Sequence, residues 1–325
     1  LLASLLSIDQ SSVPPRFGAL MVTDSQTRHP KILAGIGRYQ SLNGTALNTA
    51  HLPEVQSRLR GIRRPSVWTR GPRFLAVYFD ENHGVAIYIE ADQAFPPLDG
   101  HVLDVYGRNI ASALHVAQVH QDMDKTQSDL ILMLSEAIER RSRETGNHVR
   151  RVGEYSRILG MLSGFNEEEA DILMIGAALH DAGKIAIPDA ILTKPGKLTP
   201  EERTAMETHA EIGGSMFAGK DLPVLQAATI IAHQHHERWD GLGYPKRLKE
   251  EDIHPYGRIA ALADVFDALG SHRCYKNAWP LEDVLQLLRD ERGRHFEPKL
   301  VDLFLANLPK FLEIRDRFVD PPPTE

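Results

Sequence analysis

Hydrophobic and polar residues divide the chain into a strand-rich beginning and a helical remainder. Two apolar runs, Arg73–Phe79 (RFLAVYF) and Val85–Ala91 (VAIYIEA), flank the turn sequence DENHG and predict a β-hairpin. The stretch Phe95–Gly100 (FPPLDG) then breaks any regular element. We therefore expect residues 1–108 to form a small α/β domain with a sensory or dimerisation role.

A long helix is predicted next. Neither Pro nor Gly interrupts the stretch Asn109–Thr145, and apolar residues recur at roughly helical spacing. They are Leu103, Ile110, Leu114, Ala117, Leu130, Ile131 and Leu134. We expect residues 109–138 to connect two domains and to pair with a second copy of the chain as a coiled coil. The alternative is an amphipathic helix packed on its own core.

Residues 139–325 show an almost entirely helical pattern. Asn166 precedes three glutamates and an apolar run, and Thr199 precedes Pro200, so each is expected to cap a helix. Gly213 and Gly214 are expected near the end of the second of these helices. The predicted fold class is α+β overall, with an all-α C-terminal domain.

Composition narrows the class of protein. With 325 residues, 42% hydrophobic and 25% charged, the chain fits about two globular domains. A net charge of -7 argues against a nucleic-acid polymer or an anionic membrane as partner. The single cysteine, Cys274, favours a reducing, cytoplasmic setting, and no apolar run is long enough to span a membrane. The first residue is not Met, so we expect a fragment of a longer protein, with a further domain upstream.

Two clusters of polar residues point to a metal. His180 and Asp181 are adjacent after an apolar helix, and Lys184 follows within reach of an anion. Glu144 and His148 are four residues apart and share a helical face. Taken alone, each cluster is more often a solvated surface than a site.

Further histidines and carboxylates follow on later helices. His209 stands alone, whereas His235 and His236 are consecutive, so their side chains diverge and can reach different ions. His233 is expected to be a surface or supporting residue. Asp264 and Asp267 interrupt an apolar helix, and buried carboxylates are costly unless they are paired or bind metal. A purely structural bundle would leave them unexplained.

Together these groups indicate a multinuclear metal centre for phosphoester hydrolysis. Two neighbouring metal ions can hold both oxygens of an in-line displacement. Arg273 and Lys276 supply nearby positive charge for phosphate. No P-loop, GxSxG elbow or CxxC pair is present in the sequence, so the chemistries of those motifs lose support.

The motifs resemble those of the HD-GYP family of metal-dependent phosphohydrolases. The matching strings span Glu139–Phe304 in order: ETGNHVRRV, HDAGKIAIPDAILTKPGKLTPEE, HHERWDGLGYP, RIAALADVFDAL and RCYK. The resemblance implies a helical HD domain over residues 139–325 with two or three iron or manganese ions. It also implies hydrolysis of the second messenger cyclic di-GMP to linear pGpG, to GMP or to both.

The resemblance assigns roles to individual residues. The implied metal ligands are Glu144, His148, His180, Asp181, His209, His235, His236 and Asp264. Asp181 would bridge two ions, Glu144 would serve a third, and a metal-bridging hydroxide would be the nucleophile, which makes Asp181 and Lys184 the catalytic residues. The implied substrate contacts are Lys184, Tyr244, Arg273 and Lys276.

The sequence departs from the family pattern after the GYP turn. Arg247 and Glu250 stand where the family commonly has glycine, which affects the expected substrate preference and product length. Two alternatives stay open: a non-catalytic cyclic-dinucleotide receptor whose GYP turn binds signalling proteins, and a hydrolase of another cyclic dinucleotide. Residues 1–108 resemble GAF-like sensor modules.

Overall fold

The structure is a computed structural model that describes residues 17–23, 30–36, 66–71, 73–79, 84–90, 100–142, 146–271 and 278–320. The chain divides into two compact units, Leu1–Asp124 and Lys125–Glu325. In the described part of the chain, no helix is both long and apolar enough to cross a membrane.

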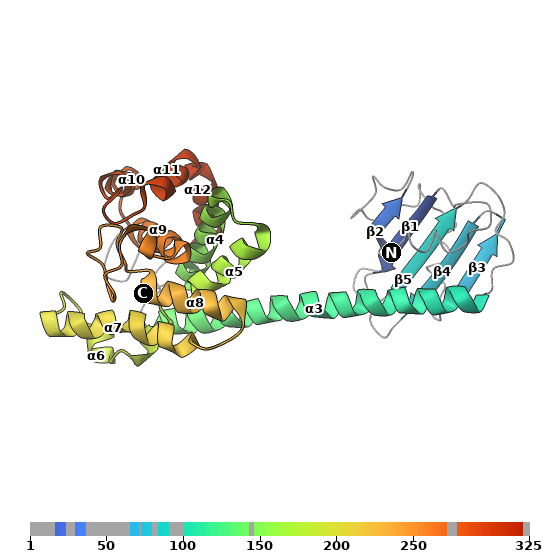
Figure 1. Ribbon diagram of the computed structural model, residues 1–325, viewed down its shortest axis with the longest axis horizontal. Helices are drawn as coiled ribbons and strands as arrows, with labels where there is room; N and C mark the ends of the chain where they lie inside the picture. Colours follow the sequence, from blue (N-terminus) through green and yellow to red (C-terminus); the bar gives the residue numbers. More distant parts are fainter. Residues whose placement is uncertain are drawn as a thin grey trace. The chain divides into compact units, whose positions relative to one another are not determined.

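The first unit contains an antiparallel sheet (Figure 1). Its strands are β1 (Phe17–Thr23), β2 (Pro30–Ile36), β3 (Ser66–Arg70), β4 (Arg73–Phe79) and β5 (Gly84–Glu90), in the spatial order β2-β1-β5-β4-β3. The predicted hairpin is confirmed, because Phe79 pairs with Gly84 and Arg73 with Glu90. Ile32 and Tyr88 are buried, as β-branched and aromatic residues on a covered sheet face should be.

The predicted long helix is also present. Helix α3 (Gly100–Arg141) runs for 42 residues, which covers the expected connecting segment 109–138. The helix ends at Arg141, shortly before residues 143–145, which lie outside the described residues. The boundaries between the predicted domains remain a prediction.

The second unit is a helical bundle, as its apolar spacing predicts. After α3 come α4 (Gly146–Ser163), α5 (Glu167–Ala178), η2 (Ala182–Ala186), α6 (Asp189–Leu192), α7 (Pro200–Phe217), α8 (Pro223–Gln234), η3 (Glu250–Asp252), α9 (Pro255–Gly270), α10 (Leu281–Asp290), α11 (Pro298–Ala306) and α12 (Leu308–Arg317). Tyr155, Phe266, Phe304 and Phe311 are buried at the centre of the core, and their rings pack against one another. This core holds the helices that carry the predicted ligands.

Both predicted N-caps form, and the helix that Thr199 caps ends close to the predicted glycines. Asn166 and Thr199 each complete a capping box with a glutamate three residues on. Helix α7 ends at Phe217, within a turn of Gly214. The two glycines also allow close packing: a Cβ at Gly213 would meet the Gly183 backbone, and one at Gly214 would overlap the His233 ring.

Gly183→Ala is expected to destabilise the helical unit by about 3 kcal/mol. An added Cβ would lie 2.6 Å from the Gly213 amide nitrogen and closer still to the His209 carbonyl oxygen. Backbone cannot move aside as a side chain can, so the contact between η2 and α7 must open. Urea unfolding followed by circular dichroism measures the loss. The control is Gly270→Ala, where a Cβ meets nothing within 4 Å; equal stability of the two variants would contradict the prediction.

Candidate metal centre

The described members of the predicted ligand set come together at the ends of several helices. His148 lies in the first turn of α4, His180 and Asp181 follow α5, and His235 and His236 follow α8, whereas His209 and Asp264 lie within α7 and α9. Two groups form, in each of which the potential ligand atoms lie within 4.8 Å of one another. One group is Asp181, His209, His235 and His236, and the other is His148, His180 and Asp264.

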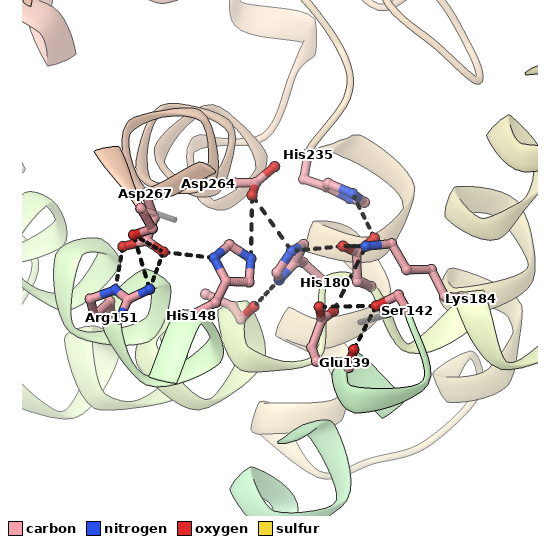
Figure 2. A network of polar contacts seen from close by, with 12 residues as sticks. Glu139, Ser142, His148, Arg151, His180, Lys184, His235, Asp264 and Asp267 are labelled. Carbon is pink, nitrogen blue, oxygen red and sulfur yellow. Dashed lines mark hydrogen bonds and ion pairs between the residues drawn. The ribbon is translucent and has the colours of Figure 1, made fainter. Parts of the chain in front are cut away.

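Asp181 lies between the two groups. Its Oδ1 atom is 3.2 Å from His209 Nε2 and 3.7 Å from His235 Nε2. Its Oδ2 atom is 3.2 Å from His180 Nε2 in the other group. On the far side, Asp264 Oδ1 is 3.5 Å from His148 Nε2 and 3.9 Å from His180 Nε2 (Figure 2). One carboxylate therefore faces both groups with different oxygens.

Backbone carbonyls fix the orientation of three of the imidazoles. The Nδ1 atoms of His180, His209 and His235 lie 2.8 Å from Ala177 O, 2.7 Å from Met206 O and 3.0 Å from Ile231 O. A carbonyl oxygen only accepts, so each Nδ1 carries a proton, and each Nε2, which lies near the Asp181 carboxylate, is the atom available to bind a metal. Metal-binding histidines are commonly held in this way.

The donor atoms fit a divalent metal. His180 Nε2 and Asp181 Oδ1 are buried and make no hydrogen bond within the described residues. Buried polar atoms that make no hydrogen bond are costly, and each of these two atoms belongs to a group of potential metal ligands. Imidazole nitrogen and carboxylate oxygen suit divalent transition metals. The two groups can therefore bind divalent metal ions.

Electrostatics differ between the two sides of the centre. Burial opposes a charge on His180, but the Asp181, Asp264 and Glu139 carboxylates outweigh it and raise the pKa of His180 to about 10. Burial, reinforced by His235 and His209, holds the pKa of His236 well below its usual range. The Asp181 pKa also lies well below its usual range, because Lys184 and His180 overcome the effect of burial. The carboxylate-rich side thus carries a proton that a divalent cation can replace.

Asp267 does not face the same groups as Asp264. Its Oδ2 atom lies 2.8 Å from His148 Nδ1, and its carboxylate accepts 2.6 and 2.9 Å hydrogen bonds from Arg151 Nε and Nη2. Arg151 is thus an ion-pair partner of Asp267 and is only 2% exposed. Arg151 and Asp267 therefore orient His148 through its Nδ1 atom (Figure 2).

Glu139 is a site residue that the sequence reasoning missed. Its carboxylate lies at the end of α3, is 2% exposed, and forms a third ligand group with His180 and Asp181. Lys184 Nζ lies 2.6 Å from Asp181 Oδ2 and 3.9 Å from Glu139 Oε1. A signal was present in the sequence: Glu139 is eight residues beyond Ile131, on the same helical face as the buried Ser135.

The predicted substrate contacts are only partly described. The Tyr244 ring stacks on the His236 ring with centroids 4.7 Å apart, which places Tyr244 beside the centre. Burial raises the Tyr244 pKa above its usual range, so its hydroxyl remains a hydrogen-bond donor at neutral pH. Arg273 and Lys276 lie outside the described residues, as does the proposed ligand Glu144. His233 bonds the Thr229 carbonyl and belongs to none of the ligand groups in the described chain.

Two family profiles match the chain. The HD domain matches residues 132–300, which is more than half of the chain. A domain of unknown function (DUF3369) matches residues 2–123. The GAF-like interpretation of the first residues is therefore not supported, because that region matches a different family.

Three curated relatives match between 54% and 72% of the chain. The 3'3'-cGAMP-specific phosphodiesterase 2 of Vibrio cholerae is 44% identical over 234 residues, which are 72% of this chain and 45% of that protein. The cyclic di-GMP phosphodiesterase response regulator RpfG of Xanthomonas campestris is 40% identical over 61% of this chain and 52% of its own length. The cyclic di-GMP phosphodiesterase of Thermotoga maritima is 44% identical over 54% of this chain and 47% of its own length. The chain spans about half the length of these relatives.

Proposed function

We propose, from the premise that this chain belongs to the HD domain family, that it is a cyclic-dinucleotide phosphodiesterase of the HD-GYP branch. The favoured reaction is hydrolysis of cyclic di-GMP to linear pGpG, to GMP or to both. The relatives named cyclic di-GMP phosphodiesterases support this substrate. The relative named as specific for 3'3'-cGAMP supports a second candidate, the mixed cyclic dinucleotide.

The observation that carries the proposal is the position of Asp181. Its two oxygens face two groups of imidazole and carboxylate donors, an arrangement suited to a carboxylate shared by two ions. When bound, divalent ions at such a centre polarise a phosphodiester and lower the pKa of water. Lys184 and the Tyr244 hydroxyl would bind the phosphate oxygens, and the proposed contacts Arg273 and Lys276 would add charge.

The metal is proposed to be iron or manganese, in two or three positions. Glu144, four residues before His148, is the proposed ligand of a third ion. The group of Glu139, His180 and Asp181 is a second place where an additional ion could bind. Imidazole and carboxylate donors accept both metals, so the choice between them rests on loading experiments.

Turnover by the metal-loaded chain tests the function. The chain is purified without oxygen, its iron and manganese per chain are measured, and it is incubated separately with cyclic di-GMP and 3'3'-cGAMP. Chromatography separates the substrate, the linear dinucleotide and the mononucleotides. We expect cyclic di-GMP to be consumed. Metal-loaded protein that binds cyclic di-GMP without hydrolysing either substrate would instead favour the receptor alternative, in which signalling proteins bind the Gly243–Pro245 turn.

The long helix carries a face suited to a second copy of the chain. A row of exposed residues along α3 alternates spacings of three and four: Val116, Val119, Met123, Thr126, Leu130, Met133 and Ala137. Leu130 and Met133 are 55% and 61% exposed, and neighbouring exposed apolar side chains of this kind mark interaction surfaces. Alternating spacings of three and four are the heptad seam of a coiled coil. Homodimerisation through α3 is therefore part of the proposal.

Replacing both Leu130 and Met133 with glutamate is expected to convert a dimer into a monomer. The dimer would then place four negative charges in its interface. Their repulsion would exceed the free energy that burial of the apolar side chains contributes to dimerisation. Sedimentation equilibrium at micromolar concentration measures the change in mass. Gln127→Glu, at an exposed position outside the row, is the matched control. A monomeric wild-type chain, or a double variant that stays dimeric, would refute the α3 interface.

A further inference from the structure

The segment that follows the GYP turn folds back onto the histidines. Glu237 comes directly after His235 and His236, and its carboxylate is only 2% exposed. One oxygen, Oε1, accepts a 2.7 Å hydrogen bond from the Lys246 amide, and Oε2 accepts a 2.9 Å bond from the Leu248 amide. A single side chain thus fastens the returning loop at two points. Bonds to a charged acceptor are stronger than those between neutral groups.

The same loop carries Tyr244 against a candidate ligand. The Tyr244 amide donates to the His236 carbonyl at 3.2 Å, and the two rings are stacked. Gly243 allows the approach, because a Cβ there would lie 2.5 Å from His236 O and 2.6 Å from the Glu237 Cα atom. The chain therefore passes directly over residues 236–238, with no room for a side chain at the crossing point.

The loop conformation is unfavourable in itself. Arg247 and Glu250 have φ angles of 56° and 51°, in the left-handed region that favours glycine. These are the two positions at which the sequence departs from the glycines expected after the turn. Arg247 lies between the two amides that Glu237 binds. The carboxylate thus compensates for a backbone conformation that the local sequence disfavours.

We propose that Glu237 is a positioning residue that holds residues 243–248 and thereby sets the Tyr244 hydroxyl for substrate binding. Asp240 does not share the task, since its carboxylate bonds Arg238 and the Leu242 amide earlier in the turn. The inference rests on the proposed function only where it assigns the substrate contact to Tyr244. The fastening of the loop by Glu237 can be tested without turnover.

Hydrogen exchange and kinetics on the full, metal-loaded chain test the two parts separately. We compare wild type with Glu237→Ala and Glu237→Gln, and with Glu251→Gln as a control at an exposed position in the same loop. In Glu237→Ala, amides within residues 244–250 should exchange about tenfold faster or more, because two buried amides lose a charged acceptor. Glu237→Gln, which retains one acceptor oxygen, should lie between wild type and Glu237→Ala. Metal per chain should not change in any variant.

The kinetic measurements test a second effect, on the binding of cyclic di-GMP. The KM for cyclic di-GMP should rise in Glu237→Ala by a larger factor than kcat falls, because the loop positions the substrate and supplies no ligand. Unchanged exchange would overturn the fastening role, and loss of metal would show that Glu237 acts through the histidines. Faster exchange with an unchanged KM would overturn the positioning role. If the wild-type chain hydrolyses no cyclic dinucleotide, the proposed function fails. The hydrogen-exchange data would still show whether Glu237 holds residues 243–248.

Discussion

Asp181→Ala is expected to lose bound metal and hydrolytic activity together. Changes at residues that merely support metal ligands weaken metal affinity by about 10–100-fold, so removing a carboxylate that faces both ligand groups should exceed that range. The substitution also removes two ion pairs of the Asp181 carboxylate. One is with Lys184 Nζ at 2.6 Å, and the other is with His180 Nε2 at 3.2 Å. The remaining imidazoles and Lys184 would repel an incoming cation more strongly than in the wild type.

Metal analysis of purified protein and turnover of cyclic di-GMP measure the effect of this substitution. Asp302→Ala is the matched control, because Asp302 is 58% exposed and pairs with Arg292 on the surface. That control should retain its metal and activity. An Asp181→Ala chain that keeps full metal content and full turnover would remove the proposed centre from consideration, whatever the substrate.

Arg151→Met is expected to destabilise the helical unit by about 3–5 kcal/mol. Arg151 is 2% exposed and donates to both oxygens of Asp267, to Ser271 Oγ and to Phe318 O. Methionine fills similar volume but leaves the buried Asp267 carboxylate without its cation. The Asp267 pKa, which His148 and Arg151 hold below its usual value against the effect of burial, should rise in the variant.

Arg157→Met provides the comparison on the same helix. Arg157 pairs with Asp171, but the two side chains are 34% and 54% exposed, so the loss should be within about 1 kcal/mol. Urea unfolding of both variants gives the difference in free energy. Metal affinity is a second measurement. Asp267 orients His148, so Arg151→Met should weaken metal binding, whereas Arg157→Met should leave it unchanged. If the two variants had equal free energies of unfolding, the buried Arg151–Asp267 pair would contribute no more to stability than the surface Arg157–Asp171 pair.

How far the sequence predicts this site depends on the type of residue. Asp264 and Asp267 were both recognisable as carboxylates in an apolar helix that needed a partner. Helical periodicity could not tell which would face the ligand groups and which would face Arg151, because that depends on where α4 packs against α9. Which of the two carboxylates faces the ligand groups is set by tertiary packing, and the local spacing of residues does not contain that information.

Glycine and glutamate illustrate the same limit. Gly213 and Gly214 were predictable as residues near a helix end, but their close contact with Gly183 and His233 was not, because it depends on residues distant in sequence. Glu139 lies one residue beyond the segment 109–138 that we expected to connect the domains, and no neighbouring residue in the sequence marked its carboxylate as part of the site. Capping boxes at Asn166 and Thr199 and the β4–β5 hairpin were predictable because each depends on residues close in sequence.

The contacts of Arg151 and Asn147 have a practical consequence for choosing the last residue of a minimal HD-domain fragment. Arg151 Nη1 lies 2.7 Å from Phe318 O and 3.1 Å from Asp320 Oδ2, and Asn147 Nδ2 donates to Val319 O. These residues follow the last helix, so a fragment trimmed at Arg317 would keep every helix. It would nevertheless leave the guanidinium behind His148 partly unsatisfied. The residues after α12 thus help to hold the predicted ligand His148 in place. A shortened fragment should therefore retain all residues up to and including Asp320.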